Sequence, residues 1–386
     1  MRIFQILEAS ANSALPSNQT WRRNLYEPLA EMGHDVFLFS PEEGRRAMQS
    51  GNERLAARFT QRLVETFRRE HAKQPFDLVF AYLMDGMVDA AGVADLKRPG
   101  VPVCNFSCNN AHQFDLVSRL AHLYDYNLHA EKDAGQKFRS VGANAVWWPM
   151  ASNPRYFRPM EASRDVAASF VGGNYGVRAR IALQLLESGI DFHAYGPGWR
   201  WGASTQLRGE MKRWLYLGRS ALSGGPAAQS RWSSALAEQD IRRRLGRLHA
   251  PHLHDPVSDE ELIALYSRSC VSLGILDVYD GHDPSKRVIR HMHLREFEAP
   301  MCGATYLTGF TPELAECFEP DREVLVYRDM EELIDKARFY ILHADAGEEI
   351  RVAGRRRALA DHTWQSRYER LFEVIGITKH RVSSVC

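Results

Sequence analysis

The sequence has almost no net charge and no long apolar segment. Its 49 lysines and arginines nearly balance its 48 aspartates and glutamates, so the formal charge at neutral pH is +1. This balance argues neither for nucleic acid nor for a polyanionic partner, and we expect no nucleic acid partner. No run approaches the roughly 18–20 apolar residues that cross a bilayer, and MRIFQILEAS lacks the apolar core of a secretory signal. We therefore expect a cytoplasmic chain without a membrane-spanning segment.

Cysteine is also scarce, with six residues in a chain of 386, too few for a disulfide framework. Cys104 and Cys108 have C-x3-C spacing, but no second cysteine pair accompanies them. The histidines of HAPHLH (249–254) and HMH (291–293) lack the i, i+4 helical spacing of typical zinc ligands. We expect these histidines at the surface or supporting other groups, and we expect no metal and no cofactor.

Short apolar strands alternate with amphipathic helices along most of the chain. RIFQIL, HDVFLFSP, PFDLVFAYL and VPVCNFS are the first strands, and the alternation restarts at VAASFVG after a polar stretch with Pro154 and Pro159. Strands separated by helices indicate parallel sheets with helices on both faces. We predict an α/β fold of two doubly wound domains. Their expected bounds are 1–155, a linker at 156–165, a second domain at 166–360 and a final helix at 361–386.

Residues 200–250 do not follow this alternation and are interpreted as part of an irregular insert spanning about 200–255. They hold ten basic and three acidic residues, with Trp201, Trp214, Tyr216 and Trp232 interleaved. Such a segment could lie on an anionic membrane surface or bind an anionic acceptor. The structural alternative is a solvated surface segment anchored by a few aromatic side chains. The pattern leaves these alternatives open.

A glycine-rich turn opens the second domain. In SFVGGNYGVRAR a strand ends in Gly172 and Gly173, and a helix with Arg178 follows. Glycines let the backbone approach a phosphate, while the helix start and an arginine favour an anion. A plain strand-to-helix turn is the alternative. TGFTPEL supplies a second such turn, in which Thr311 caps a helix that has Pro312 at its first position.

Between the two turns, HLREFEAPM is interpreted as a helix on which Arg295 and Glu298 share one face. Phe297 and Met301 would then point into the core. Ligands of open α/β sheets bind beyond the carboxyl ends of the strands, where Glu298 would accept two ribose hydroxyls and Arg295 would meet a pyrophosphate. The alternative is an intrahelical ion pair, which contributes only a few tenths of a kcal/mol.

The stretches FVGGNYGVRARIALQLLESGIDFHAYGPGW, SDEELIALYSRSCVSLGI and HLREFEAPMCGATYLTGFTPELAECFEP resemble the spore-maturation CgeB-like branch of the group 1 glycosyltransferases. The resemblance covers nearly the whole chain and is strongest over 295–330. It implies a GT-B architecture, in which two Rossmann-like domains face each other across a cleft and C-terminal helices cross back to the first domain. Enzymes of this fold do not normally hold a catalytic divalent ion.

The resemblance also assigns roles to single positions. Glu298 matches the carboxylate that holds the donor ribose, and Arg178 matches a basic residue near the diphosphate. The loop facing the diphosphate and the sugar corresponds to Gly309, Phe310, Thr311 and Glu313. Many relatives carry a further glutamate eight positions before the ribose carboxylate, where this chain has Arg290. This difference leaves the donor sugar and the stereochemistry open.

A general base is expected in the first domain, where Asp85, His112 and Asp115 follow predicted strands. A structural or capping role is the alternative for each of them. We predict a metal-independent glycosyltransferase that moves a sugar from a nucleotide-diphosphate sugar to a glycan, lipid-linked or protein acceptor, as in cell-surface polysaccharide synthesis. The competing hypotheses are a nucleotide-sugar epimerase or hydrolase and a non-catalytic nucleotide-sugar-binding protein of the same fold.

Overall fold

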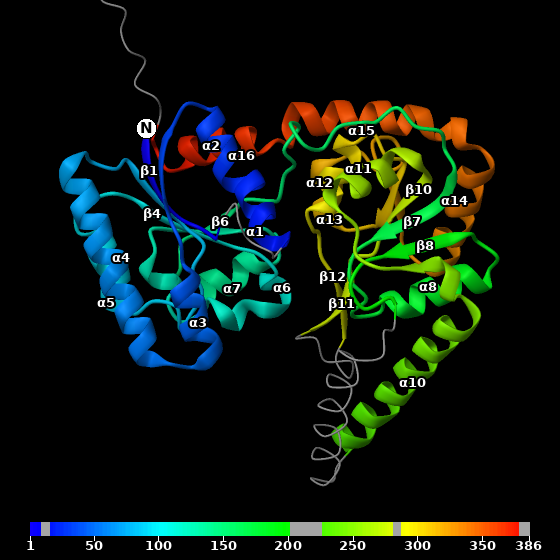
Figure 1. Ribbon diagram of the computed structural model, residues 1–386, viewed down its shortest axis with the longest axis horizontal. Helices are drawn as coiled ribbons and strands as arrows, with labels where there is room; N and C mark the ends of the chain where they lie inside the picture. The colour runs from blue at the N-terminus through cyan, green and yellow to red at the C-terminus, as the bar shows by residue number, and fades with distance from the viewer. Residues whose placement is uncertain (9–15, 201–225, 281–286, 378–386) are drawn as a thin grey trace, which may run out of the picture. The chain divides into compact units, whose positions relative to one another are not determined.

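The computed structural model describes residues 1–8, 16–200, 226–280 and 287–377. The chain divides into two compact units (Figure 1). The first comprises Met1–Asn153 together with Asp361–Cys386, and the second comprises Pro154–Ala360. Each unit is built on its own parallel six-stranded sheet, which confirms the predicted α/β fold with two Rossmann-like sheets.

The sheet of the first unit has the strand order β2-β1-β3-β4-β5-β6. Its strands are β1 (Arg2–Ile6), β2 (Asp35–Phe39), β3 (Leu78–Ala81), β4 (Val103–Ser107), β5 (Tyr126–His129) and β6 (Ala145–Trp147). β3 and β4 are buried along their whole length. Burial along the whole strand is typical of parallel strands covered on both faces.

The helices of the first unit are α1 (Pro16–Trp21), α2 (Glu27–Glu31), α3 (Glu42–Ser50), α4 (Glu53–Lys73), α5 (Ala90–Lys97), α6 (Asn110–Gln113), α7 (Ala134–Ser140) and α16 (Trp364–Val374). The sequence predicts a single helix ending at Gly33, but a π-helical turn, Arg22–Tyr26, separates α1 from α2. α16 closes the unit from the far end of the chain. Its Trp364 indole donates to Asn24 Oδ1 at 2.9 Å, and its Tyr368 hydroxyl donates to the Leu25 carbonyl at 2.7 Å.

The sheet of the second unit has the order β14-β13-β10-β7-β8-β9. Its strands are β7 (Val166–Val171), β8 (Phe192–Tyr195), β9 (Leu253–His254), β10 (Ser269–Gly274), β13 (Tyr306–Gly309) and β14 (Leu325–Tyr327). Numbered in chain order, this is the 3-2-1-4-5-6 arrangement of dinucleotide-binding folds. The strand order therefore reverses between β7 and β10, and the crevice beyond their carboxyl ends is the expected ligand position.

The helices of the second unit are α8 (Arg178–Glu187), α10 (Pro226–Leu248), α11 (Asp259–Arg268), α12 (Arg295–Met301), α13 (Pro312–Cys317), α14 (Met330–Leu342) and α15 (Glu348–Asp361). The expected helix at HLREFEAPM is present as α12, and Phe297 and Met301 on it are fully buried. Thr311 caps α13 by accepting a hydrogen bond from the Leu314 amide at 3.0 Å, as the sequence predicts.

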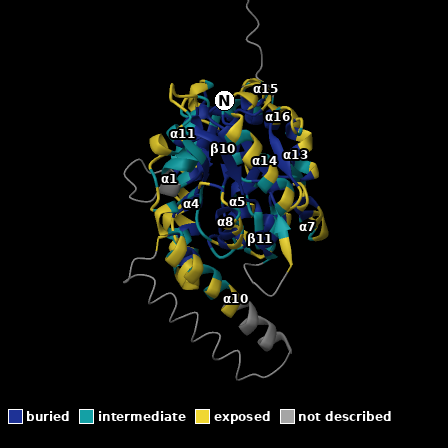
Figure 2. Cartoon of the chain, turned by 90° about the vertical axis from the view of Figure 1, so that its right-hand side faces the viewer, coloured by how far each residue is buried: buried dark blue, intermediate teal, exposed yellow. Residues whose placement is uncertain are grey.

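Two features differ from the sequence interpretation. The segment read as an irregular insert contains helix α10, whose described part is largely exposed in contrast to the buried strand β10 (Figure 2). Residues 201–225, which hold several of its basic and aromatic side chains, lie outside the described part of the chain. An antiparallel hairpin of β11 (Asp277–Tyr279) and β12 (Val288–Arg290) also stands beside the main sheet. Among the described helices, none is both long and apolar enough to span a bilayer.

Candidate functional site

Arg178 lies at the point where the strand order of the second sheet reverses. It is fully buried, and its guanidinium stacks on the Tyr175 ring at 3.8 Å from the ring centre. Nη1 donates to the Gly173 carbonyl at 2.9 Å, and Nη2 donates to the Ile275 carbonyl at 3.1 Å. Gly173 follows β7 and Ile275 follows β10, so one side chain joins the two loops that border the crevice.

The charge of Arg178 persists at neutral pH despite this burial. Burial lowers the pKa of Arg178 to about 10, and the neighbouring positive charge of Arg295 adds to the effect. A buried cation raises the affinity of the surrounding crevice for an anion. The sequence prediction that Arg178 approaches a diphosphate remains a prediction. Its Nη1 and Nη2 donate to backbone carbonyls, which fixes the guanidinium beside the glycine-rich turn.

Arg295 supplies a second cation to the same end of β7. Its Nε donates to the Val171 carbonyl at 2.6 Å. A Cβ atom on Gly172 would lie 2.6 Å from Arg295 Nη2 and 2.8 Å from the Phe170 ring. A side chain at position 172 would therefore clash with the Arg295 guanidinium, which packs directly against the Gly172 α-carbon. Two guanidinium groups thus border the glycine-rich turn.

Glu298 lies on the same helix as Arg295 and is only 6% exposed. In the part of the chain that the structure describes, its carboxylate takes part in no hydrogen bond and no ion pair. The alternative of an intrahelical ion pair with Arg295 is therefore not realised. Burial raises the pKa of the Glu298 carboxyl to about 7, although the nearby Arg295 opposes this shift.

A different carboxylate on α12 has a structural role. Glu296 is fully buried, with Oε2 accepting from the His293 amide at 2.6 Å and Oε1 accepting from the Tyr306 hydroxyl at 2.6 Å. It fixes the start of α12 against strand β13. The charge pattern of HLREFEAPM does not show which of Glu296 and Glu298 has the structural role. The two side chains differ only in the face of α12 on which they lie.

The second turn lies at the carboxyl ends of β13 and β14. The Phe310 amide donates to the Tyr327 carbonyl at 2.8 Å, and the Arg328 guanidinium lies 4.8 Å from the centre of the Phe310 ring. Gly309 is needed here because a Cβ would lie 2.7 Å from Arg290 Nε. Glu313 in the first turn of α13 is half-buried.

Arg290 is held by a carboxylate that the sequence analysis did not single out. Its Nε pairs with Asp277 Oδ1 at 3.1 Å across the β11–β12 hairpin. Its Nη1 lies 3.4 Å from the Phe310 carbonyl and 3.3 Å from the Tyr327 carbonyl. The Arg290 guanidinium therefore stands over the ends of β13 and β14, beside the loop of Gly309 and Phe310.

The three candidate bases of the first unit have different surroundings. Asp85 accepts from the backbone amides of Arg119 at 2.8 Å and Leu120 at 3.1 Å, a loop-fixing arrangement. His112 is buried in the short helix α6, and Asp115 is exposed two residues beyond that helix. No hydrogen bond or ion pair joins His112 to Asp115, both of which the structure describes.

Glu131 organises the loop that carries His112, and the sequence analysis did not identify it. It is 2% exposed and accepts from the backbone amides of Asn109 at 2.5 Å and Asn110 at 3.0 Å. Asn109 is in the left-handed region with φ 63°. The only sequence signal for this contact is a carboxylate just after the strand β5.

Known proteins share a family pattern and a fold with this chain. The family model described as glycosyl transferase-like matches residues 178–373. None of the curated proteins compared with the chain matches it in sequence.

Several solved structures share the fold over almost the whole chain. A glycosyltransferase from Rickettsia africae has a TM-score of 0.62 at 12% identity, covering 98% of this chain and 99% of its own. Sucrose-phosphate synthase from Thermosynechococcus elongatus has a TM-score of 0.59 at 14% identity, covering 97% and 98%. Anabaena HepE, solved in complex with UDP-glucose, has a TM-score of 0.56 at 9% identity, covering 98% and 99%.

Proposed function

Because this chain belongs to the glycosyl transferase-like family and has the GT-B fold, we propose that it transfers a sugar from a nucleotide-diphosphate sugar bound by the second unit. Within the family, the resemblance to the CgeB-like branch is part of this proposal. The observation that carries the proposal is the carboxylate of Glu298, nearly buried and without a hydrogen-bonding partner among the described residues.

A buried carboxylate without donors is costly, and such groups occur mainly where a ligand supplies the missing hydrogen bonds. Two vicinal ribose hydroxyls match the two carboxylate oxygens, since each hydroxyl donates one hydrogen bond. Binding of a ribose would stabilise the ionised form of Glu298. The raised pKa of Glu298 in the free protein supports this role. Without donors the ionised carboxylate is unfavourable, and hydrogen bonds from a ligand would stabilise it.

The diphosphate would lie beside the glycine-rich turn, where Arg295 and Arg178 provide positive charge. Charge develops on the leaving diphosphate as the bond to the sugar breaks, and cations held in fixed positions beside it would stabilise that charge. We propose that these arginines take the place of a catalytic divalent ion. The sugar would lie toward Gly309, Phe310 and Thr311, with Glu313 behind this loop and Arg290 beside it.

We propose that the first unit handles the acceptor. His112 and Asp115 remain the candidate bases, and Asp85 is the weakest of the three because both of its carboxylate oxygens accept backbone amides. The proposal also includes a cytoplasmic location and a glycan, lipid-linked or protein acceptor. It further includes peripheral membrane contact through residues 200–250. Supporting the last point, Arg243 and Arg247 line one hollow together with the buried Trp199, while Arg200 in the same hollow pairs with Asp255 at 3.2 Å.

Release of nucleoside diphosphate from a panel of nucleotide sugars tests the proposal. A transferase releases the product fastest when an extract containing acceptors is added, and Glu298→Gln should abolish that stimulation. A hydrolase or epimerase would convert the donor equally well without acceptor. A binding protein would retain the nucleotide sugar with no turnover under either condition.

A further inference from the structure

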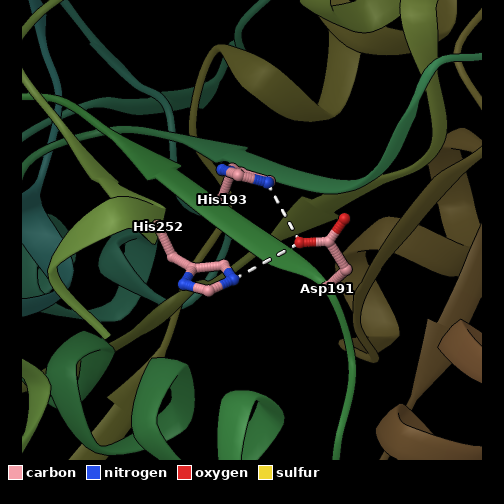
Figure 3. Close-up of side chains that lie close together, drawn as sticks. All are labelled: Asp191, His193 and His252. Carbon is pink, nitrogen blue, oxygen red and sulfur yellow. Dashed lines mark ion pairs between the residues drawn. The ribbon is translucent and has the colours of Figure 1, made fainter. Parts of the chain in front are cut away.

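Two histidines and an aspartate gather at the edge of the second sheet, at the amino-terminal end of β8. Asp191 immediately precedes β8, His193 lies on it, and His252 immediately precedes the edge strand β9 (Figure 3). Asp191 Oδ1 lies 3.1 Å from His193 Nε2 and 3.4 Å from His252 Nε2. The potential ligand atoms of all three residues lie within 4.8 Å of one another.

The strand register creates this cluster. β8 and β9 are parallel, with Ala194 opposite Leu253 and Tyr195 opposite His254. Because side chains alternate along a strand, His193 and Tyr195 share one face of β8. His254 on β9 lies opposite Tyr195, and His252, just before β9, is close to His193. The Tyr195 and His254 rings stack with centroids 4.3 Å apart, and the His193 and His252 rings lie 5.1 Å apart.

From this arrangement we propose that Asp191, His193 and His252 bind a divalent transition-metal ion, with Zn²⁺ as the natural occupant. Imidazole nitrogens and a carboxylate oxygen form a common ligand set for zinc. Neighbouring ligand atoms around tetrahedral zinc lie about 3.3 Å apart, since each metal–ligand bond is about 2.0–2.2 Å. The two measured separations from the Asp191 oxygen have this size.

His254 supports the proposed ligand His193 from behind. His193 Nδ1 lies 2.9 Å from His254 Nε2. When His193 carries its proton on Nδ1 and donates it to His254, the lone pair of Nε2 faces Asp191 and is available to a metal. Metal-binding histidines usually have such a partner for the second ring nitrogen, because it fixes the tautomer and the ring orientation.

The site is open to solvent, since the Asp191 side chain is 62% exposed while His193 and His252 are 25% and 29% exposed. Water would complete the coordination. The bound ion would fasten β9, where the chain returns from α10, to β8. This role is structural and separate from the donor site, which lies at the carboxyl ends of β7 and β10.

Zinc titration of chelator-treated, full-length protein against a chromophoric chelator tests the proposal. Wild type should bind one Zn²⁺ per chain, and Asp191→Asn and His252→Gln should each lower the affinity about tenfold or more. His343→Gln, which changes an exposed histidine elsewhere in the second unit, is the control and should bind as wild type does. Both cluster variants replace a ligand by a side chain of similar size. Melting temperatures in chelator that match wild type would show that the variants fold.

A second readout needs no variant. Co²⁺ in place of zinc should give visible absorption bands of four-coordinate nitrogen and oxygen ligation, without the charge-transfer band of a thiolate. A thiolate band would assign the metal to a cysteine and overturn the proposal. The proposal is equally overturned if wild type does not bind Zn²⁺, or if Asp191→Asn and His252→Gln bind it with wild-type affinity.

Discussion

Glu296 and Glu298 lie two positions apart on α12 and have opposite surroundings. The carboxylate of Glu296 receives hydrogen bonds from the His293 amide and the Tyr306 hydroxyl, whereas that of Glu298 receives none from any described residue. Both are buried. Glu296 therefore has a structural role, whereas Glu298 lacks donors among the described residues. This difference is the basis for placing a nucleotide ribose at Glu298.

The stability of the protein should depend on pH through Glu298. Its pKa is about 7 in the folded chain, against 4.5 for an ordinary glutamate. The folded state therefore holds its proton more tightly than the unfolded state, and stability falls as pH rises from about 4.5 to 7, at up to about 1.4 kcal/mol per pH unit. Glu298→Gln has no such group, so its melting temperature should rise relative to wild type between about pH 5 and 8. Parallel profiles for the two proteins would contradict this expectation.

Glu296→Gln provides the matched control for the nucleotide site, because Glu296 already has protein donors. With its oxygen toward the His293 amide, the glutamine would donate from its nitrogen to the Tyr306 hydroxyl, so two charge-assisted hydrogen bonds become weaker neutral ones at a cost of about 1 kcal/mol. Thermal unfolding should show a lower melting temperature, while calorimetric titration should show little change in nucleotide affinity. A large loss of affinity in the folded Glu296→Gln protein would assign the ligand contact to the wrong carboxylate.

Arg178→Lys should destabilise the second unit although the charge is kept. An ammonium group cannot bond to both the Gly173 and Ile275 carbonyls in the planar geometry of a guanidinium. Losing one of these buried hydrogen bonds costs about 1–3 kcal/mol, which corresponds to a few degrees in melting temperature. Arg180→Lys, two positions along the same helix at an exposed site, should melt as wild type does. Equal melting of both variants would show that Arg178 does not hold the loops together.

Arg290→Ala should separate sugar recognition from nucleotide recognition. Arg290 pairs with Asp277 and stands beside the loop of Gly309 and Phe310, whereas Glu298 and Arg295 lie on α12. The affinity for a bare nucleoside diphosphate should change less than about threefold, while the rate of sugar release falls by tenfold or more, on the order of 1.4 kcal/mol in the barrier. Calorimetry and a product-release assay measure the two effects. An equal loss of nucleotide affinity would place Arg290 at the nucleotide instead.

Local patterns in the sequence predict the elements that depend on near neighbours. The alternation of strands and helices predicts both parallel sheets, and the TGFTPEL turn predicts the Thr311 cap and the position of Pro312. The i, i+3 and i, i+4 spacings on α12 predict buried Phe297 and Met301. The Thr311 cap and the buried face of α12 follow from contacts within a few residues. The parallel sheets follow from the order of strands and helices, which local periodicity is sufficient to predict.

Contacts between distant segments are not predictable in this way. The pairing of Asp277 with Arg290 requires a hairpin that is not among the predicted elements, although DGHDPS between the two residues is rich in turn-forming residues. The approach of His252 to His193 depends on the register of two parallel strands. The direction of Arg178 is a further example. Its position after the glycine turn suggests a ligand contact, but the fold turns its Nη1 and Nη2 onto two carbonyls.

The most direct test of the central claim is a thermal-shift comparison of wild type and Glu298→Gln with UDP, GDP, CDP, ADP and dTDP and their common sugars, with and without magnesium. A ligand at about 100 times its dissociation constant adds about 2.7 kcal/mol to stability. We expect a shift of several degrees for one base, independent of magnesium, that is lost in Glu298→Gln and kept in Glu296→Gln. No shift with any nucleotide, or an equal shift in Glu298→Gln, would contradict a nucleotide site at Glu298.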